Sequence, residues 1–351
     1  MFCFLILNYK FAFSTNIRTI IFYKVSYVEV PPEIDGVLDE DCWQKTDSAV
    51  VFYEYWKPEP GPGELRTEFK MLYNKKGVYL GIKNYDEYVD KIKATIKEDD
   101  SPNLWTDDCN EIYFDQNAAG IGYLKFTVNF LGAKHNLRQI DTALSDLFWK
   151  GQDWFYKTSK GKDYWIVEAF FPWNDLLKVK EPKEELWMFN IVRYSYSTGN
   201  FRGVTWSPGG NYMCPDKFGY IYFSSEDKNI NQIGSILSKK VTPPWELVFE
   251  NGFLTCLNKG NFFFIPFEKF LQGEKKKIED WIEKVNKLID KVPKNKNLEK
   301  YFNQYDSIKK EFTEIDYSST SKEKIIDQLK KIRLITTQIE EIYWRFKIEL
   351  L

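Results

Sequence analysis

A tryptophan and several carboxylates stand together near residue 110. Residues 101–115 read SPNLWTDDCNEIYFD, so Trp105 lies in a turn-prone segment just before a short acidic strand that carries Glu111 and Asp115. The apolar face of an indole can pack on the C–H face of a pyranose ring, while carboxylates accept hydrogen bonds from its hydroxyl groups. These residue types at this spacing indicate a site for a carbohydrate.

The same carboxylates invite a catalytic interpretation. Glycoside hydrolysis needs an acid and a base about 5 to 10 Å apart across the scissile bond. Asp108 and Glu111 are an odd number of residues apart, so they would face opposite sides of one strand. The pattern favours binding, with a glycoside hydrolase or an accessory subunit of one as the alternative. The carboxylates considered are those of Asp107, Asp108, Glu111 and Asp115.

Composition excludes several other classes. A formal net charge of −2 over 351 residues provides no basic stripe for nucleic acid. His135 is the only histidine, which excludes a multi-histidine metal site and leaves one base for nucleophilic catalysis. Without a run of eighteen apolar residues, no membrane span is expected. Five widely spaced cysteines form neither a disulfide framework nor a zinc motif: Cys3, Cys42, Cys109, Cys214 and Cys256.

Three motifs in a fixed order carry a resemblance to a known family. They are IDGVLDEDCW at 34–43, LWTDDCNEIYFD at 104–115 and PDKFGYIYF at 215–223. Together they resemble the carbohydrate-binding modules of family 9, over about residues 26–224. The resemblance implies a mainly β chain with an antiparallel β-sandwich of DOMON-like, immunoglobulin-like architecture. It also implies non-catalytic binding of an oligosaccharide or polysaccharide, linked to polysaccharide breakdown in an extracellular or periplasmic setting.

The resemblance assigns roles to particular residues. Trp105 and Tyr212 would be the two plates of an aromatic clamp, where sugar binders of the family use two tryptophans. Glu111, Asn129 and Asn211 would be the polar groups of the sugar site.

The chain departs from the family pattern at one position of this site. Thr127 stands where those sugar binders carry an arginine two residues before the asparagine. A sandwich that has lost its sugar site and serves assembly is therefore a further alternative.

Two cofactors follow from the resemblance as further expectations. Structural calcium is the first, with hard oxygen ligands available from the acidic residues near the opening motif. Haem, which some relatives bind, would need His or Met axial ligands, and His135 is expected in a polar surface turn. No cofactor other than calcium is expected. The acidic residues are Asp35, Asp39, Glu40 and Asp41, and the methionines considered are Met71, Met188 and Met213.

The residues of the expected sugar site must be positioned by strands, which the sequence predicts from short runs of β-branched and aromatic residues. These runs alternate with turn signals between residues 26 and 224, as in a sandwich or barrel. The segments 74–77 (NKKG) and 160–163 (KGKD) predict hairpins, because glycine tolerates the positive φ of such turns. Residues 1–25 are expected to be an extension that includes a degenerate export signal, since the apolar start is broken at Asn8 and Lys10.

The last third of the chain changes its periodicity. Residues 225–267 predict a linker and a small β appendage with a turn at 250–252, and residues 268–351 predict a helical bundle or coiled coil. Three apolar stripes with helical spacing begin near Ile278, Tyr301 and Ile325, and Thr320 with Glu323 predicts a capping box before the third. The helices are expected to pack together or to bind a protein partner.

Overall fold

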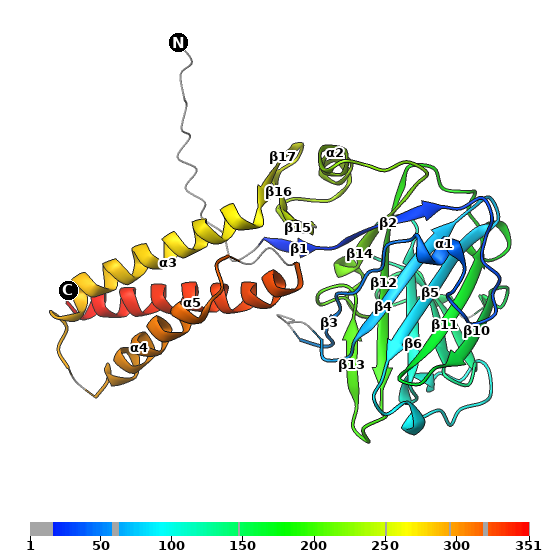
Figure 1. Cartoon of the computed structure of the whole chain (residues 1–351), viewed down its shortest axis with the longest axis horizontal. Helices are drawn as coiled ribbons and strands as arrows, with labels where there is room; N and C mark the ends of the chain where they lie inside the picture. The colour runs from blue at the N-terminus through cyan, green and yellow to red at the C-terminus, as the bar shows by residue number, and fades with distance from the viewer. Residues whose placement is uncertain are drawn as a thin grey trace, which may run out of the picture.

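The computed structural model describes residues 17–57, 63–146, 148–249, 251–294, 296–318 and 322–350. Over these residues the chain forms a β-sandwich, a small second sheet beside it, and an arm of three long helices that extends away from both (Figure 1). The mainly β sandwich followed by a helical region agrees with the predicted fold class. Cys3 and the expected export signal, apart from its last residues, lie outside the described residues.

One curled sheet makes both layers of the sandwich. Among the described residues it has thirteen strands, mostly antiparallel, and β2 pairs in parallel with both of its neighbours. In spatial order the main path is β10 (Phe155–Lys160), β11 (Tyr164–Pro172), β5 (Gly77–Tyr85), β4 (Thr67–Tyr73), β2 (Phe22–Tyr27), β14 (Gly219–Ser224), β12 (Glu185–Ser195), β6 (Cys109–Asp115), β7 (Tyr123–Asn129), β8 (Lys134–Gln139) and β9 (Ser145–Asp146). Off this path, β13 (Arg202–Thr205) pairs with β12 and with β3 (Tyr53–Glu54).

Alternate side chains of these strands fill the space between the layers. Since side chains along a strand point to opposite faces in turn, every second residue reaches the core. On β6 the inward residues are Ile112 and Phe114, and on β12 they include Phe189 and Ile191. The rings of Phe114 and Phe189 lie 5.0 Å apart. The outward-pointing residues of the same two strands do not take part in this core.

Both hairpins predicted in the sandwich are present. The turn at 74–77 joins β4 to β5, and the amide of Asn74 donates to the carbonyl oxygen of Gly77 at 3.0 Å. A side chain at Gly77 would collide with the carbonyl group of Phe171, so glycine is required there for close approach. The turn after β10 closes with a 2.8 Å bond from the amide of Gly161 to the carbonyl of Tyr164.

The opening motif is bound across the outer face of the β11–β5 layer. Glu168 on β11 is fully buried, and its carboxylate accepts hydrogen bonds from the backbone amides of Asp35 and Gly36 at 3.0 and 2.8 Å. Its other oxygen accepts from the indole N–H of Trp43, which lies on α1 (Asp41–Gln44), at 3.0 Å. The IDG turn and the tryptophan of the motif are therefore structural in this chain.

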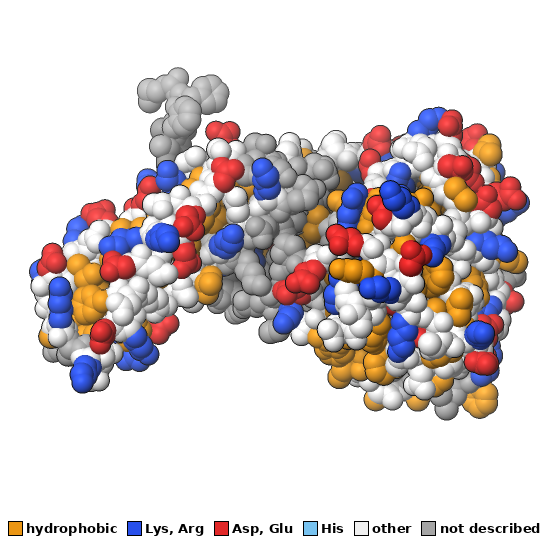
Figure 2. Space-filling view, turned by 60° about the horizontal axis from the view of Figure 1, so that its bottom comes forward, with side chains coloured by type: hydrophobic (Ala, Val, Ile, Leu, Met, Phe, Trp, Pro, Cys, Tyr) orange, Lys and Arg blue, Asp and Glu red, His pale blue; other side chains and the backbone are white. Residues whose placement is uncertain are grey.

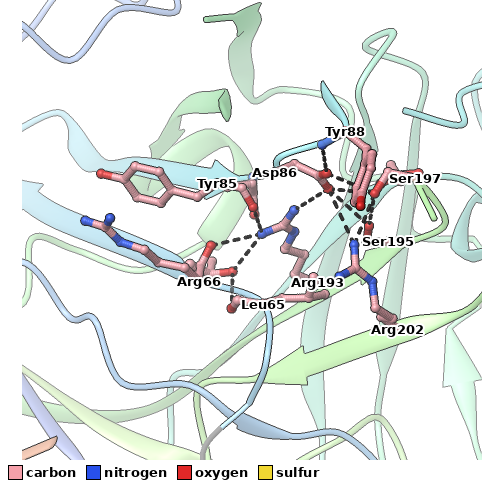
Figure 3. Close-up of polar contacts among 12 residues, drawn as sticks. Leu65, Arg66, Tyr85, Asp86, Tyr88, Arg193, Ser195, Ser197 and Arg202 are labelled. Carbon is pink, nitrogen blue, oxygen red and sulfur yellow. Dashed lines mark hydrogen bonds and ion pairs between the residues drawn. The ribbon is translucent and has the colours of Figure 1, made fainter. Parts of the chain in front are cut away.

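A buried ion pair ties β12 to the opposite layer (Figure 3). Arg193 on β12 contacts the carboxylate of Asp86 at 3.0 Å and donates to the carbonyl oxygens of Tyr85 and Arg66 at 2.8 and 3.0 Å. Both members of the pair have fully buried side chains, and the Ser197 hydroxyl donates to Asp86 at 2.9 Å. Burial lowers the pKa of Arg193 to about 10, so the guanidinium remains charged at neutral pH. This network fixes the strand that carries Tyr194.

The segment after the sandwich is more ordered than a linker. An eleven-residue helix, α2 (Ile230–Lys240), begins with a capping box in which Asn229 and Gln232 satisfy each other's backbone amides. Beyond it lies a four-stranded sheet, β1 (Arg18–Ile20), β15 (Trp245–Phe249), β16 (Gly252–Asn258) and β17 (Asn261–Pro266), whose β15–β16 hairpin turns at the predicted place.

The N-terminal strands join the two sheets. β1 pairs in parallel with β15 in the small sheet, and β2 follows after one residue to pair in the sandwich. The sandwich sheet thus starts at Phe22, four residues before the expected start at 26. One hydrophobic cluster also runs from the outer face of the sandwich, at Phe218 and Tyr220, to Leu237 of α2 and Trp245 of β15.

Three helices make the arm. They are α3 (Phe267–Ile289), α4 (Glu299–Glu314) and α5 (Lys322–Glu349), with α4 running opposite to the other two (Figure 1). Their apolar stripes pack into one cluster that reaches Tyr53 of the sandwich, and Arg333 pairs with buried Glu246 of β15 at 3.1 Å. No helix in the described part of the chain is both long enough and apolar enough to span a bilayer. Thr320 lies outside the described residues, so its capping box stays a prediction.

Glu168 should make stability depend on pH. Burial raises the pKa of its carboxyl from 4.5 to about 7, against the opposing effect of its three N–H donors. Because the folded-state pKa exceeds the unfolded one, the stabilisation is complete below pH 4.5 and is lost as pH rises through 7. The unfolding free energy should therefore fall by up to about 3 kcal/mol between pH 5 and 8, and Glu168→Gln should remove that slope. Urea titrations at four pH values measure it, and parallel slopes for the two proteins would contradict the assignment.

Removing the buried partner of Arg193 should destabilise the sandwich. Asp86→Asn keeps the shape but leaves the guanidinium charge without a counter-ion, so we expect a loss of about 3 kcal/mol in unfolding free energy. Asp90→Asn is the control, because Asp90 forms an exposed ion pair with Lys160 and its loss should change little. Equal effects of the two substitutions in chemical denaturation would show that burial of the Asp86 pair does not matter.

Candidate functional site

The outer face of β12, β6, β7 and β8 gathers polar and aromatic side chains. The strand register aligns Glu111 of β6 with Val192 of β12 on one side and Thr127 of β7 on the other, and Thr127 in turn with His135 of β8. The residues two positions along form neighbouring rows on the same face. One row is Tyr194, Cys109 and Asn129, and the other is Asn190, Tyr113, Lys125 and Leu137.

Glu111 is the polar centre of this face. The residue is almost fully buried, and its carboxylate contacts the ammonium of Lys125 at 3.0 Å. The other carboxylate oxygen accepts hydrogen bonds from the hydroxyl groups of Tyr113 and Tyr194, the second at 3.1 Å. Burial, reinforced by the charge of Glu111, raises the pKa of both tyrosines well above the usual value. They therefore stay protonated and act as donors to the carboxylate.

An aromatic wall borders Glu111 at one end. Tyr212 has 47% of its surface exposed and its ring meets that of Trp56 at 5.8 Å, nearly at a right angle. Its carbonyl oxygen accepts a 2.9 Å hydrogen bond from Tyr123, whose ring packs 5.2 Å from Tyr113. Tyr212 is thus connected to the Glu111 centre through two tyrosines.

Trp105 lies at the other end of the same strands. It belongs to a single 3-10 turn, η2 (Leu104–Thr106), that leads into β6, and half of its surface is exposed. Its carbonyl oxygen accepts a hydrogen bond from the Tyr196 hydroxyl at 3.1 Å, and Tyr196 packs on Phe201 at 5.6 Å. Phe201 also packs 5.6 Å from Tyr194, the donor to Glu111.

The two expected clamp residues are therefore associated with different ends of β6. Trp105 precedes Cys109, whereas Tyr212 reaches the sheet beside Tyr113. Four strand steps separate Cys109 from Tyr113, which corresponds to about 13 Å of strand. Two exposed ring groups border the face, with the Glu111–Lys125 pair between their points of attachment.

The two expected asparagines are engaged inside the protein. Asn129 is fully buried, and its amide group donates to the carbonyl oxygen of Ile96 at 2.7 Å and to Asp107 at 3.1 Å. Its side-chain oxygen accepts from the amide of Ala133 at 2.9 Å. Asn211 is buried too, and its side-chain oxygen accepts from the amide of Met213 at 2.8 Å. Both side chains shape loops at the border of the face.

The sequence analysis missed the cation of this site. It noted the loss of a family arginine at Thr127, but Thr127 is buried while Lys125, two residues earlier on the same face, carries the charge to Glu111. The two-residue period of a strand was the available signal. The aromatic residues that come from distant segments were not predicted either. The surplus of 22 tyrosines and 12 tryptophans was the only hint of them. They are Tyr55, Trp56, Tyr123, Tyr194 and Phe201.

The remaining carboxylates of the central motif hold loops. Asp107 accepts from the backbone amides of Thr95 and Ile96, both at 2.9 Å. Asp108 accepts from the backbone amides of Lys93 and Tyr196 at 2.9 and 3.1 Å, and burial raises its pKa.

Asp115 has the same kind of role at the far end of β6. It accepts from the amides of Asn117 and Gly120 at 3.1 and 2.6 Å, and burial raises its pKa as well. Of the four carboxylates in the motif, Glu111 is the one that lies among the rings.

The acidic residues of the opening motif are used locally. Asp35 accepts from the amide of Val37 at 2.8 Å, Glu40 accepts from the amide of Glu33 at 2.9 Å, and Asp41 pairs with Lys45 at 3.1 Å. Within the described ranges no three His, Cys, Asp or Glu side chains are gathered as they would be around a metal ion.

Among the candidate haem ligands, His135, Met71 and Met188 lie in strands, whereas Met213 is exposed outside the sheets. His135 was expected in a turn but lies in β8, because the chain turns earlier, at Gly132 with a φ of 85°, and the strand resumes at Lys134. Met71 and Met188 are buried in two different clusters. The described cysteines are free thiols, at positions Cys42, Cys109, Cys214 and Cys256.

Charges of both signs are mixed over the visible surface. Figure 2 shows Lys and Arg interspersed with Asp and Glu on the sandwich and on the arm, while hydrophobic side chains gather at the lower edge of the sandwich. This surface lacks the single-sign field that steers polyanions or polycations. The distribution suits an uncharged ligand.

Two solved structures are similar to this chain at low sequence identity. The chain is similar to a family 9 carbohydrate-binding module from Caldicellulosiruptor kristjanssonii in complex with glucose, with 20% sequence identity and a TM-score of 0.44 over 60% of this chain and 99% of that one. It is also similar to a family 9 module from that organism in complex with cellotriose, with 19% identity and a TM-score of 0.44 over 60% of this chain and 96% of the other. No curated protein matches the chain.

A family model gives the decisive match. The model described as "Carbohydrate family 9 binding domain-like" covers residues 34–225, which is more than half of the 351 residues. The match spans all three motifs and the strands β3 to β14, including those that carry Glu111 and its donors. The chain therefore belongs to the carbohydrate family 9 binding domain-like family, the family that its motifs resemble.

Proposed function

We propose that the outer face of β12, β6, β7 and β8 binds a neutral oligosaccharide or polysaccharide without catalysis. Membership in the carbohydrate-binding family supports the ligand class. The observation that carries the proposal is the Glu111–Lys125 pair on a sheet face that the half-exposed rings of Trp105 and Tyr212 border. A carboxylate and an ammonium 3.0 Å apart can accept from one sugar hydroxyl and donate to the next.

Stacking supplies the second part of the binding energy. Trp105 and Tyr212 each expose about half of their surface, and an aromatic ring packs well on the C–H face of a pyranose. Tyr113 and Tyr194 orient the carboxylate, which lowers the entropy that the site loses on binding. Asn129 and Asn211 act through the loops that they hold, and Lys125 takes the place of the missing arginine as the charged donor.

Binding without turnover fits the positions of the carboxylates. A glycosidase needs a second carboxyl group across the scissile bond from the first. Asp107 and Asp108 each use one oxygen on two backbone amides, and Asp108 and Asp115 are buried. We infer that the chain assists polysaccharide breakdown by attaching to the polysaccharide. This takes place outside the cytoplasm, because polysaccharides do not cross membranes.

Titration calorimetry on hits from a glycan array tests the proposal. Trp105→Ala should weaken sugar binding by about 1 to 3 kcal/mol, since it removes a stacking surface, and should leave the thermal midpoint within about 2 °C. Trp344→Ala is the control, because this tryptophan on α5 is exposed to a similar degree but belongs to the arm.

One outcome would change the proposed site, and another would contradict the proposed function. Unchanged affinity of Trp105→Ala at full occupancy would remove the tryptophan from the site. Release of reducing sugar by the native chain that is abolished in Glu111→Gln would identify a glycoside hydrolase instead.

A further inference from the structure

Trp56 is held in a backbone conformation that bulky residues avoid. Its φ is 63°, in the left-handed region, which costs roughly 1 to 2 kcal/mol for a residue with a Cβ atom. Half of its surface is exposed, so burial of the indole offsets little of this cost. Strain of this kind persists where the surrounding structure enforces it, and it is concentrated at functional sites.

The preceding residue, Tyr55, holds Trp56 in this backbone conformation. Tyr55 is buried, its amide donates to the carbonyl oxygen of Gly203 at 3.2 Å, and its hydroxyl is hydrogen-bonded to that of Tyr194 at 2.8 Å. A Cβ atom at Gly203 would lie 3.1 Å from the Cβ atom of Tyr55, so glycine on β13 permits this close approach. Since Tyr194 also donates to Glu111, one hydrogen-bonded chain links the polar centre to the base of Trp56.

The indole meets Tyr212 to form a corner. Their ring centroids are 5.8 Å apart with an angle of 83° between the planes, and Tyr55 supports the indole from behind at 5.2 Å. An edge-to-face contact of this kind uses the face of only one of the two rings. Because Trp56 and Tyr212 are both about half exposed, the corner offers two ring surfaces to a ligand.

We propose that Trp56 and Tyr212 form a second sugar subsite, next to a first subsite over Glu111 and Lys125. The ligand is then a neutral oligosaccharide of at least two pyranose units, whose second unit lies in the corner. This inference rests on the proposed function and assigns a role to a residue from the segment after β3, outside the three family motifs.

The chemistry of the corner favours an uncharged sugar unit. Burial raises the pKa of the neighbouring phenols Tyr55 and Tyr123, so they stay neutral around pH 7. On the strand face beside the corner, the charges of Glu111 and Lys125 neutralise each other. This pair would therefore give a charged sugar unit no partner in exchange for its lost hydration.

A series of sugars with one to three units tests the second subsite. Titrations of the full chain use glucose, cellobiose and cellotriose, and xylose, xylobiose and xylotriose. Trp56→Ala should weaken di- and trisaccharide binding about ten-fold, which corresponds to about 1.4 kcal/mol, and leave monosaccharide binding within about two-fold. Trp56→Phe should restore most of the loss because it keeps a stacking ring, and Trp344→Ala on the arm should change nothing.

A second variant guards against misfolding. Trp56→Gly removes the same ring but adopts a φ of 63° without strain, so it should be at least as stable as the native chain in thermal unfolding. It should show the same length-dependent loss as Trp56→Ala.

Each remaining outcome decides a different claim. Equal losses for mono-, di- and trisaccharides would put Trp56 in the first subsite and overturn the inference, and so would unchanged affinity for all six sugars. A native chain that binds none of the six and no neutral glycan on the array contradicts the proposed function itself. Native binding that is insensitive to Trp56 contradicts only the second subsite.

Discussion

The alternation of side chains along β6 and β12 constrains both faces of the sandwich. Each inward residue, such as Phe114 or Phe189, is fixed by the packing of the two layers, and each outward neighbour is fixed with it. Glu111 therefore cannot turn away from the outer face without displacing Ile112 from the core. A one-residue slip of either strand would bury the carboxylate between the layers and expose the aromatic core. The packing of the core therefore fixes the positions of the side chains on the outer face.

Buried acidic side chains in this chain follow one pattern. Glu111, Glu168 and Asp86 are each removed from water, and each is met by several donors. An unpaired charge would cost several kcal/mol at any of these places, so the donors must be in position before the fold is stable. Two of the three carboxylates fasten layers or loops together, while Glu111 is buried on the outer face of the sandwich beside its tyrosine donors.

Much of the fold could be predicted from the sequence because its signals are local. The turns at 74–77 and 160–163, the three helical stripes and the family motifs depend on neighbouring residues. α2 was missed although its capping box is visible in the sequence, since a polar stretch before it looked like a linker. β1 and β2 were missed because their partners, β15 and β14, lie about two hundred residues away.

The site was less predictable, because its members come together only in the folded chain. The role of Asn129 depends on the carbonyl group of Ile96, thirty-three residues earlier. Trp56 reaches Tyr212 across more than 150 residues. Lys125 was missed because the expected charge was sought at Thr127, although residues two apart on a strand share one face.

Two covalent connections, at β2 and at β14, attach the small sheet and the arm to the sandwich. The two strands run side by side in parallel, from the pair Phe22 and Tyr220 to the pair Ser26 and Ser224. β1 enters at the first end and the chain leaves towards α2 at the other, about 13 Å apart by strand rise. An attachment at two separated points resists rotation about either of them. Whatever the arm is fastened to would therefore set the direction in which the proposed sugar-binding face points.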